Sequence, residues 1–88
     1  MVKVKHNLEI DGKGFIFDPE TGYSYNLNHA ALHILNQLKS GSSLPQIADS
    51  LQHKYKIDRR AAIIDLDDFL RQLKSLELVS SYEVINLA

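Results

Sequence analysis

Hydrophobic and polar residues alternate with a period of two along the first third of the chain. Short runs of this kind cover residues 8–10, 15–17 and 23–27, and the last run places its two tyrosines and its leucine on one face. Segments 11–12 (DG) and 18–22 (DPETG) separate the runs, and both have the composition of tight turns. The pattern predicts three short strands joined as an antiparallel meander.

The apolar period changes to that of an α-helix after residue 27. Each of three helical stretches begins after a residue that commonly caps helix N-termini: Asn28, Ser43 and Asp58. We expect the first helix to end before Gly41, the second to end near Tyr55, and the third to run over about 59–76. The predicted core stripe of the third helix is Ala62, Leu66, Phe69, Leu73 and Leu76. Residues 78–85 are consistent with a final strand or a trailing arm.

The order of the elements, strands first and helices afterwards, indicates a fold class. It is typical of an α+β domain with helices packed on one face of a sheet. Three short helices joined by capped turns also resemble a winged helix-turn-helix unit, in which the strands form the wing. No repeat or linker interrupts the 88 residues, so we expect a single domain over 1–88.

Composition narrows the classes of function. Ten Lys and Arg against eleven Asp and Glu give a net charge of -1, too weak a field to attract nucleic acid or an anionic membrane. The chain has no cysteine, which excludes disulfides, thiol nucleophiles and Cys-ligated metals. We see no signal peptide and no apolar run of the roughly 18 residues that a membrane span needs, so we expect a cytoplasmic protein.

Candidates for catalysis or metal binding are few. His29 and His33 have the spacing of helical metal pairs, but an alanine follows the first and no third ligand is apparent. The third helix carries Asp65, Asp67 and Asp68, which fit a solvated acidic face better than an acid–base pair. We therefore expect no enzyme activity, no metal and no cofactor.

A winged helix-turn-helix unit often binds DNA through its third helix. Here that helix carries carboxylates in the middle of its exposed surface, where they would repel phosphates. Basic residues do gather around the turn before it: Lys54, Lys56, Arg59 and Arg60. A DNA-binding regulator therefore stays an alternative, although we expect no nucleic-acid partner.

The edge of the third strand is unusual. That strand consists of Tyr23, Ser24, Tyr25, Asn26 and Leu27. It contains neither Lys nor Pro, which commonly protect a free sheet edge, so it suits an extended peptide that adds a strand through main-chain hydrogen bonds. Two alternatives remain: residues 80–88 cover the edge, or two copies pair across it as a small homodimer. We expect a monomer or a weak dimer.

Four segments together resemble PqqD-like peptide chaperones. Residues 15–28 (FIFDPETGYSYNLN) look like the strand–Pro-Glu–strand–Leu-Asn passage of that family. The other segments that are similar to family helices are 30–35, 43–51 and 65–73, the last followed by a closing Leu-Val. The resemblance covers roughly 8–79, and it departs from the family at Glu77, where Gly is common.

The resemblance implies a function. Members of this family are recognition elements that hold the leader segment of a ribosomally made precursor peptide in a groove between the third strand and the third helix. They deliver the precursor to a separate enzyme, which is a radical SAM protein in cofactor and thioether pathways and a leader peptidase in lasso pathways. The resemblance therefore implies a non-catalytic binding module whose partners are the precursor peptide and one of these enzymes.

One flank of the third helix is predicted to form the groove wall opposite residues 23–27. Ile63 and Leu70 widen the apolar stripe on one side, and Asp67 and Lys74 continue that flank. We expect Ile63 and Leu70 to take an apolar leader side chain and Lys74 to pair with a leader carboxylate. The alternative is that Ile63 and Leu70 pack as ordinary core.

Overall fold

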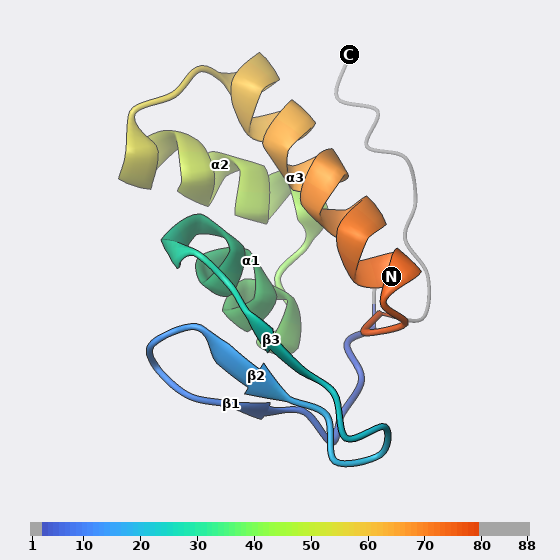
Figure 1. Cartoon of the computed structure of the whole chain (residues 1–88). Helices are drawn as coiled ribbons and strands as arrows, with labels where there is room; N and C mark the ends of the chain where they lie inside the picture. Colours follow the sequence, from blue (N-terminus) through green and yellow to red (C-terminus); the bar gives the residue numbers. More distant parts are fainter. Residues whose placement is uncertain (1–2, 80–88) are drawn as a thin grey trace.

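A computed structural model of the chain describes residues 3–79. Three strands come first and three helices follow, so the predicted α+β class is confirmed (Figure 1). The strands are β1 (Glu9–Ile10), β2 (Phe15–Phe17) and β3 (Ser24–Asn26), and the helices are α1 (His29–Lys39), α2 (Leu44–Tyr55) and α3 (Arg59–Ser75). The final strand considered for residues 78–85 lies outside the described residues from residue 80 onward.

β2 is the central strand of an antiparallel sheet with the order β1-β2-β3. Ile16 lies opposite Ile10 on one side and Tyr25 on the other, and its side chain is fully buried. Its neighbours Phe15 and Phe17 point to the other face, where Phe15 is exposed. The sheet therefore has one face on the core and one toward solvent, and β3 is an edge strand.

The three N-caps predicted from the sequence are confirmed. Asn28 Oδ1 and Asp58 Oδ1 accept hydrogen bonds of 2.8 and 2.7 Å from the backbone N–H three residues further along. Ser43 and Gln46 form a capping box, in which each side chain accepts from the backbone N–H of the other. These local bonds begin the helices where the chain predicts them.

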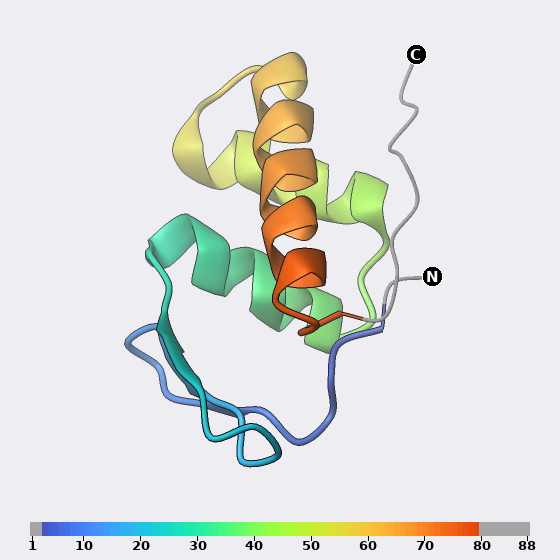
Figure 2. The same cartoon turned by 45° about the vertical axis from the view of Figure 1, so that its right-hand side comes forward.

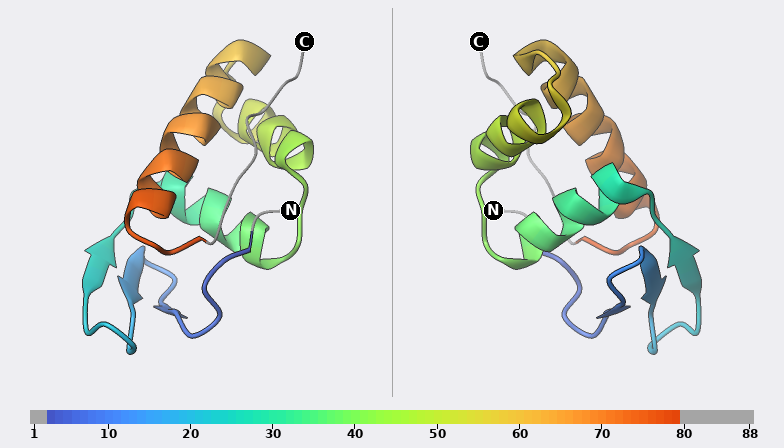
Figure 3. Two further views of the ribbon diagram at one scale, coloured as in Figure 1. Left: turned by 90° about the vertical axis from the view of Figure 1, so that its right-hand side faces the viewer. Right: turned by 90° about the vertical axis from the view of Figure 1, so that its left-hand side faces the viewer.

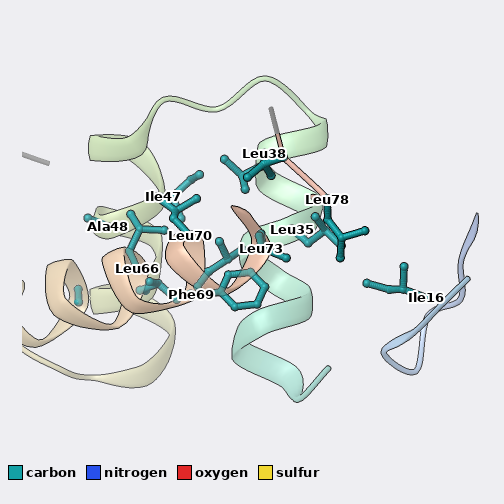
Figure 4. Close-up of a cluster of buried hydrophobic side chains, with 14 of the residues drawn as sticks. Ile16, Leu35, Leu38, Ile47, Ala48, Leu66, Phe69, Leu70, Leu73 and Leu78 are labelled. Atoms are coloured by element: carbon teal, nitrogen blue, oxygen red, sulfur yellow. The ribbon is translucent and has the colours of Figure 1, made fainter. Parts of the chain in front are cut away.

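One hydrophobic core joins the helices to the inner face of the sheet (Figure 4). α2 and α3 pack against each other, and the views in Figures 1 and 3 show α1 between α2 and the sheet, with the C-terminal end of α3 reaching down beside α1 toward β3. The fully buried side chains include Ile16, Leu35, Ile47, Leu66 and Leu70. Every element from β2 to α3 therefore contributes to the same core.

The end of α3 is tied to the N-terminal segment. The Leu78 N–H donates to the Leu73 carbonyl at 2.9 Å, and the Leu78 carbonyl accepts from the Lys5 N–H at 2.9 Å. Val79 forms an isolated antiparallel bridge with Val4. Figure 2 shows the resulting arrangement, in which the last turn of α3 points toward the sheet and the segment that follows it runs to the start of the described chain.

The core stripe predicted for α3 is confirmed at Ala62, Leu66, Phe69 and Leu73, which are buried. The prediction is wrong for Leu76, whose side chain is 44% exposed. The helix ends at Ser75 and Leu76 is its C-cap, so the side chain no longer follows the helical stripe. The Leu76 side chain lies at the surface beside β3 instead.

Candidate functional site

The hydrogen bonds between β2 and β3 alternate along the strands. At one end the Asp18 N–H donates to the Tyr23 carbonyl at 2.9 Å, and at the other the Leu27 N–H donates to the Gly14 carbonyl at 2.8 Å. Opposite residues in an antiparallel ladder alternate between bonded and non-bonded pairs. Tyr25, midway between these ends, is therefore the remaining residue of β3 that bonds to β2.

Ser24 and Asn26 consequently direct their main-chain groups away from β2. They lie opposite Phe17 and Phe15 in the non-bonded pairs, so their N–H and C=O groups point to the outer edge of the sheet. Among the described strands none pairs with that edge. Such free groups accept another strand. The alternative in which residues 80–88 cover the edge falls outside the described residues.

The side chains of β3 alternate between the two faces of the sheet. Tyr25 and Leu27 are half-buried against the core, whereas Ser24 and Asn26 are exposed. Tyr23 continues the inner row just before the strand, and its side chain is 66% exposed. Because residues that face each other across two strands point to the same side, an added strand directs every second side chain toward the helices.

A hollow of about 400 Å³ lies where the end of β3 and the start of α1 meet the middle of α3. The side chains that α3 contributes are Asp65, Asp68, Phe69 and Gln72. The facing wall includes Leu27, Ala31 and Ile34. The hollow therefore combines an apolar floor with polar groups on the helix.

A second hollow, of about 380 Å³, lies beside the other end of β3. Tyr23, Ser24 and Tyr25 line one side, and residues 75–77 at the end of α3 line the other. Asp65, Asp68 and Gln72 are spaced three or four apart on one face of α3, and the C-cap Leu76 lines the second hollow, so the helix and its C-cap run along both hollows. We call the two hollows and the free edge of β3 the β3–α3 groove.

The helix flank predicted to line this groove lies elsewhere. At 3.6 residues per turn, Ile63, Asp67, Leu70 and Lys74 are about half a turn around α3 from the face that borders the hollows. Leu70 is fully buried and Ile63 packs against the core, which is the alternative that the sequence left open. Figure 4 draws Leu70 among the buried side chains.

The two charged residues of that flank are not at the hollows either. Asp67 Oδ2 is 3.0 Å from Arg71 Nε in an ion pair one turn along the helix, and Lys74 is exposed without lining either hollow. The face that borders the groove, with Asp65, Asp68 and Phe69, lies on the other side of the core stripe. The helical wheel shows two flanks beside the core stripe, and its period alone does not say which one the sheet approaches.

A buried ion pair holds the turn that leads into β3. Asp18 is 2% exposed, and its Oδ2 accepts a hydrogen bond of 2.8 Å from Lys5 Nζ while its Oδ1 accepts one of 3.0 Å from the Glu20 N–H. The bond from Lys5 is the main reason that the pKa of Asp18 is lowered, against the opposing effect of burial. The same bond raises the pKa of Lys5.

Sequence reasoning missed this pair, since it interpreted residues 18–22 only as a turn. Lys5 also lines the second hollow and bonds through its backbone to Leu78. It thus links the β2–β3 turn to the end of α3, the two walls of the groove at that end. A carboxylate directly after an apolar strand was the available signal, but its partner lies thirteen residues away.

Of the two histidines on α1, His33 forms a contact between helices. His33 Nε2 and Ser50 Oγ are 2.7 Å apart, which joins α1 to α2. Partial burial, and then the charge of Lys54, lower the pKa of His33. Among residues 3–79 no group of three or more His, Asp or Glu side chains is arranged to hold a metal ion.

The basic residues before α3 are partly engaged within the fold. Arg59 forms an ion pair with Asp49 and donates a hydrogen bond of 3.0 Å to Gln52 Oε1, so it fastens α3 to α2. Lys54, Lys56 and Arg60 are exposed around the same turn.

In the part of the chain that the structure describes, no helix is long and apolar enough to cross a membrane.

Two solved structures resemble this fold closely. One is described as TbiB1 in complex with the TbiA(beta) leader peptide; it is 28% identical, its TM-score is 0.82, and the alignment covers 92% of this chain and 98% of that one. The other, lasso peptide synthetase B1 complexed with the leader peptide, is 22% identical with a TM-score of 0.80, over 91% and 98% of the two chains. The second similarity shows the fold alone.

The family comparison covers most of the chain. No curated protein sequence is similar enough to count as a match. The family model of coenzyme PQQ synthesis protein D (PqqD), however, matches residues 13–79. That range contains β2, β3, all three helices and both walls of the β3–α3 groove. The chain therefore belongs to the PqqD family, as the order of its segments indicates.

Proposed function

We propose that this protein binds the leader segment of a ribosomally synthesised precursor peptide as an added strand on β3 and presents it to a separate modifying enzyme. The observation that carries the proposal is the orientation of Ser24 and Asn26, whose main-chain groups face outward beside two hollows. TbiB1, 28% identical to this chain, was solved with a leader peptide. Membership of the PqqD family agrees with this role.

Strand addition divides the recognition into two parts. The outward N–H and C=O groups of Ser24 and Asn26 offer up to four hydrogen bonds, each worth about 0.5–1.5 kcal/mol in net terms, and they bind any extended peptide. Side chains that enter the hollows add apolar burial at about 25 cal/mol per Å² and distinguish one peptide from another. The edge therefore provides a docking register, and the hollows provide selectivity.

The protein itself acts in this proposal without catalysis, metal or cofactor. Its partner is a peptide-modifying enzyme, either a radical SAM enzyme or a leader peptidase, that works in the cytoplasm on the peptide held here. The groove side chains are carboxylates, amides, hydroxyls and apolar groups, and Lys5, the one amine among them, is paired with the carboxylates of Asp18 and Glu20. Such an arrangement favours binding over bond cleavage.

Proline at position 24 tests the added strand directly. Ser24→Pro removes an outward N–H that takes no part in the β2–β3 ladder, and edge strands tolerate proline at such positions. The test peptides are overlapping segments that together cover the short open reading frames next to the gene. We expect the variant to fold and to lose most of its affinity for those peptides that the wild type binds. Ser24→Ala, which keeps the N–H, is the matched control and should bind as the wild type does.

The readouts are fluorescence anisotropy for affinity and amide chemical shifts in NMR for location. Shifts confined to β3 and the groove face of α3 are expected. Equal binding by a folded Ser24→Pro variant would overturn strand addition on β3. Steeply salt-dependent binding to DNA, or a stable dimer by light scattering that excludes peptide, would favour the alternative functions instead.

A further inference from the structure

Asp65 and Asp68 lie on the groove face of α3 and line the hollow at the end of β3. Both are exposed, and neither forms a hydrogen bond or ion pair with any residue in 3–79. The lining of this hollow contains no Lys, Arg or His. Two carboxylates with the same charge therefore face the space where an added strand would place a side chain.

The same hollow has an apolar floor beneath the carboxylates. Ile34 and Phe69 are buried at its base, and Ala31 is half-buried beside them. Long basic side chains bury their aliphatic stems on apolar surface while the charged head stays near solvent. An apolar floor with an acidic rim suits such a side chain better than it suits a purely apolar or an acidic one.

The other hollow has a different character. Tyr23 is 66% exposed and Leu76 is 44% exposed, and both line it. Its one lysine, Lys5, is held by Asp18 at 2.8 Å and by Glu20 at 3.4 Å. Exposed aromatic and aliphatic surface without a free cation favours a large apolar side chain.

The spacing of residues along β3 fixes how far apart in a bound peptide the basic and the apolar side chain must be. Tyr23 and Leu27 are four residues apart on the inner row, one beside each hollow. Side chains of an added strand that lie opposite them point to the same face and are also four residues apart, whichever way the strand runs.

We propose that the β3–α3 groove selects peptides that carry Lys or Arg opposite Leu27, over Asp65 and Asp68, and a large apolar residue four positions away, opposite Tyr23. This inference rests on the proposed function and names the peptide class that the site takes. Each exposed ion pair contributes modestly, so loss of both carboxylates weakens binding about 3- to 10-fold, and more at low salt than at high salt.

A display library of random dodecapeptides, selected against the immobilised full chain, tests the proposal. The expected peptides share a basic residue and a large apolar residue four apart. The same selection against Asp65→Asn/Asp68→Asn should lose the basic preference and keep the apolar one. Asp67→Asn, the same chemical change on the opposite side of α3, is the matched control and should select the wild-type pattern.

The outcomes separate this inference from the proposed function. Peptides that require the Ser24 N–H, yet show no basic preference or bind the double variant equally well, overturn the inference and leave strand addition intact. A selection that enriches no peptide, or only peptides that bind Ser24→Pro as well as wild type, overturns both. Affinities measured by anisotropy at low and high salt provide the quantitative comparison.

Discussion

Lys5 Nζ donates a hydrogen bond of 2.8 Å to Asp18 Oδ2, and this bond attaches the N-terminal segment to the turn at one end of the β3–α3 groove. Asp18 begins the turn into β3, while the backbone N–H of Lys5 donates to Leu78 just beyond α3. A single residue, through its side chain and its backbone, therefore fixes the edge strand relative to the end of α3. The relationship has consequences for both stability and binding.

We expect Lys5→Met to destabilise the fold and to weaken peptide binding, because it leaves the buried Asp18 carboxylate without its cation. Thermal unfolding and anisotropy measure the two effects. Lys13→Met, which removes a charge from an exposed position, should change neither. Binding that is unaffected in a destabilised Lys5→Met would show that the pair holds the fold but not the groove.

The pair also predicts how stability depends on pH. The pKa of Asp18 is lowered from 3.8, so its contribution is present above that value and is lost as the pH falls through the lowered pKa. The pKa of Lys5 is raised from 10.5, so its contribution is present below that value and is lost as the pH rises through the raised pKa. Urea unfolding of wild type and Asp18→Asn from acid to neutral pH should show the wild-type advantage shrinking only at acid pH.

Glu77→Gly should stabilise the protein by about 0.5–1 kcal/mol. Glu77 directly follows the C-cap of α3 and has a φ of 60°, a left-handed conformation that costs an L-residue about 1–2 kcal/mol, and glycine avoids most of that cost. Glu77→Ala keeps the cost and is the control. Chemical denaturation at neutral pH measures the difference, and an unchanged or lower midpoint for Glu77→Gly would contradict the prediction.

Gly14→Ala should destabilise the sheet by more than about 1 kcal/mol. Gly14 has a φ of 102°, and an added Cβ would overlap the carbonyl oxygen of Leu27, whose N–H bonds to Gly14. Gly12 has open space around it and no such φ, so Gly12→Ala should cost little. Hydrogen exchange at the Leu27 amide reports the loss locally, and comparable effects of the two substitutions would refute this account.

Leu70→Ala and Leu76→Ala should separate core from groove. Leu70 is fully buried, so its truncation should cost about 2–5 kcal/mol of stability. Leu76 is 44% exposed and lines the second hollow, so its truncation should leave stability within about 0.5 kcal/mol and weaken binding of a peptide with an apolar residue there. If Leu70→Ala weakened binding without loss of stability and Leu76→Ala did the reverse, the flank of α3 that contains Leu70 would line the groove, as the sequence predicted.

Local features of the fold were predictable because their causes lie within a few residues. Asn28, Ser43 and Asp58 cap helices through bonds to backbone N–H groups three residues away, and those bonds form as expected. The period of two over 23–27 likewise indicated a strand whose inner row is Tyr25 and Leu27.

The groove required the tertiary structure. The sequence predicted a free edge along residues 23–27, but it placed Ile63, Asp67, Leu70 and Lys74 opposite that edge. A helical period defines a stripe and two flanks, and only the packing of α3 on its neighbours decides which flank is buried and which faces β3. Residues far apart in the chain, such as Lys5 and Asp18, meet for the same reason: their contact is set by the assembled fold and by no local pattern.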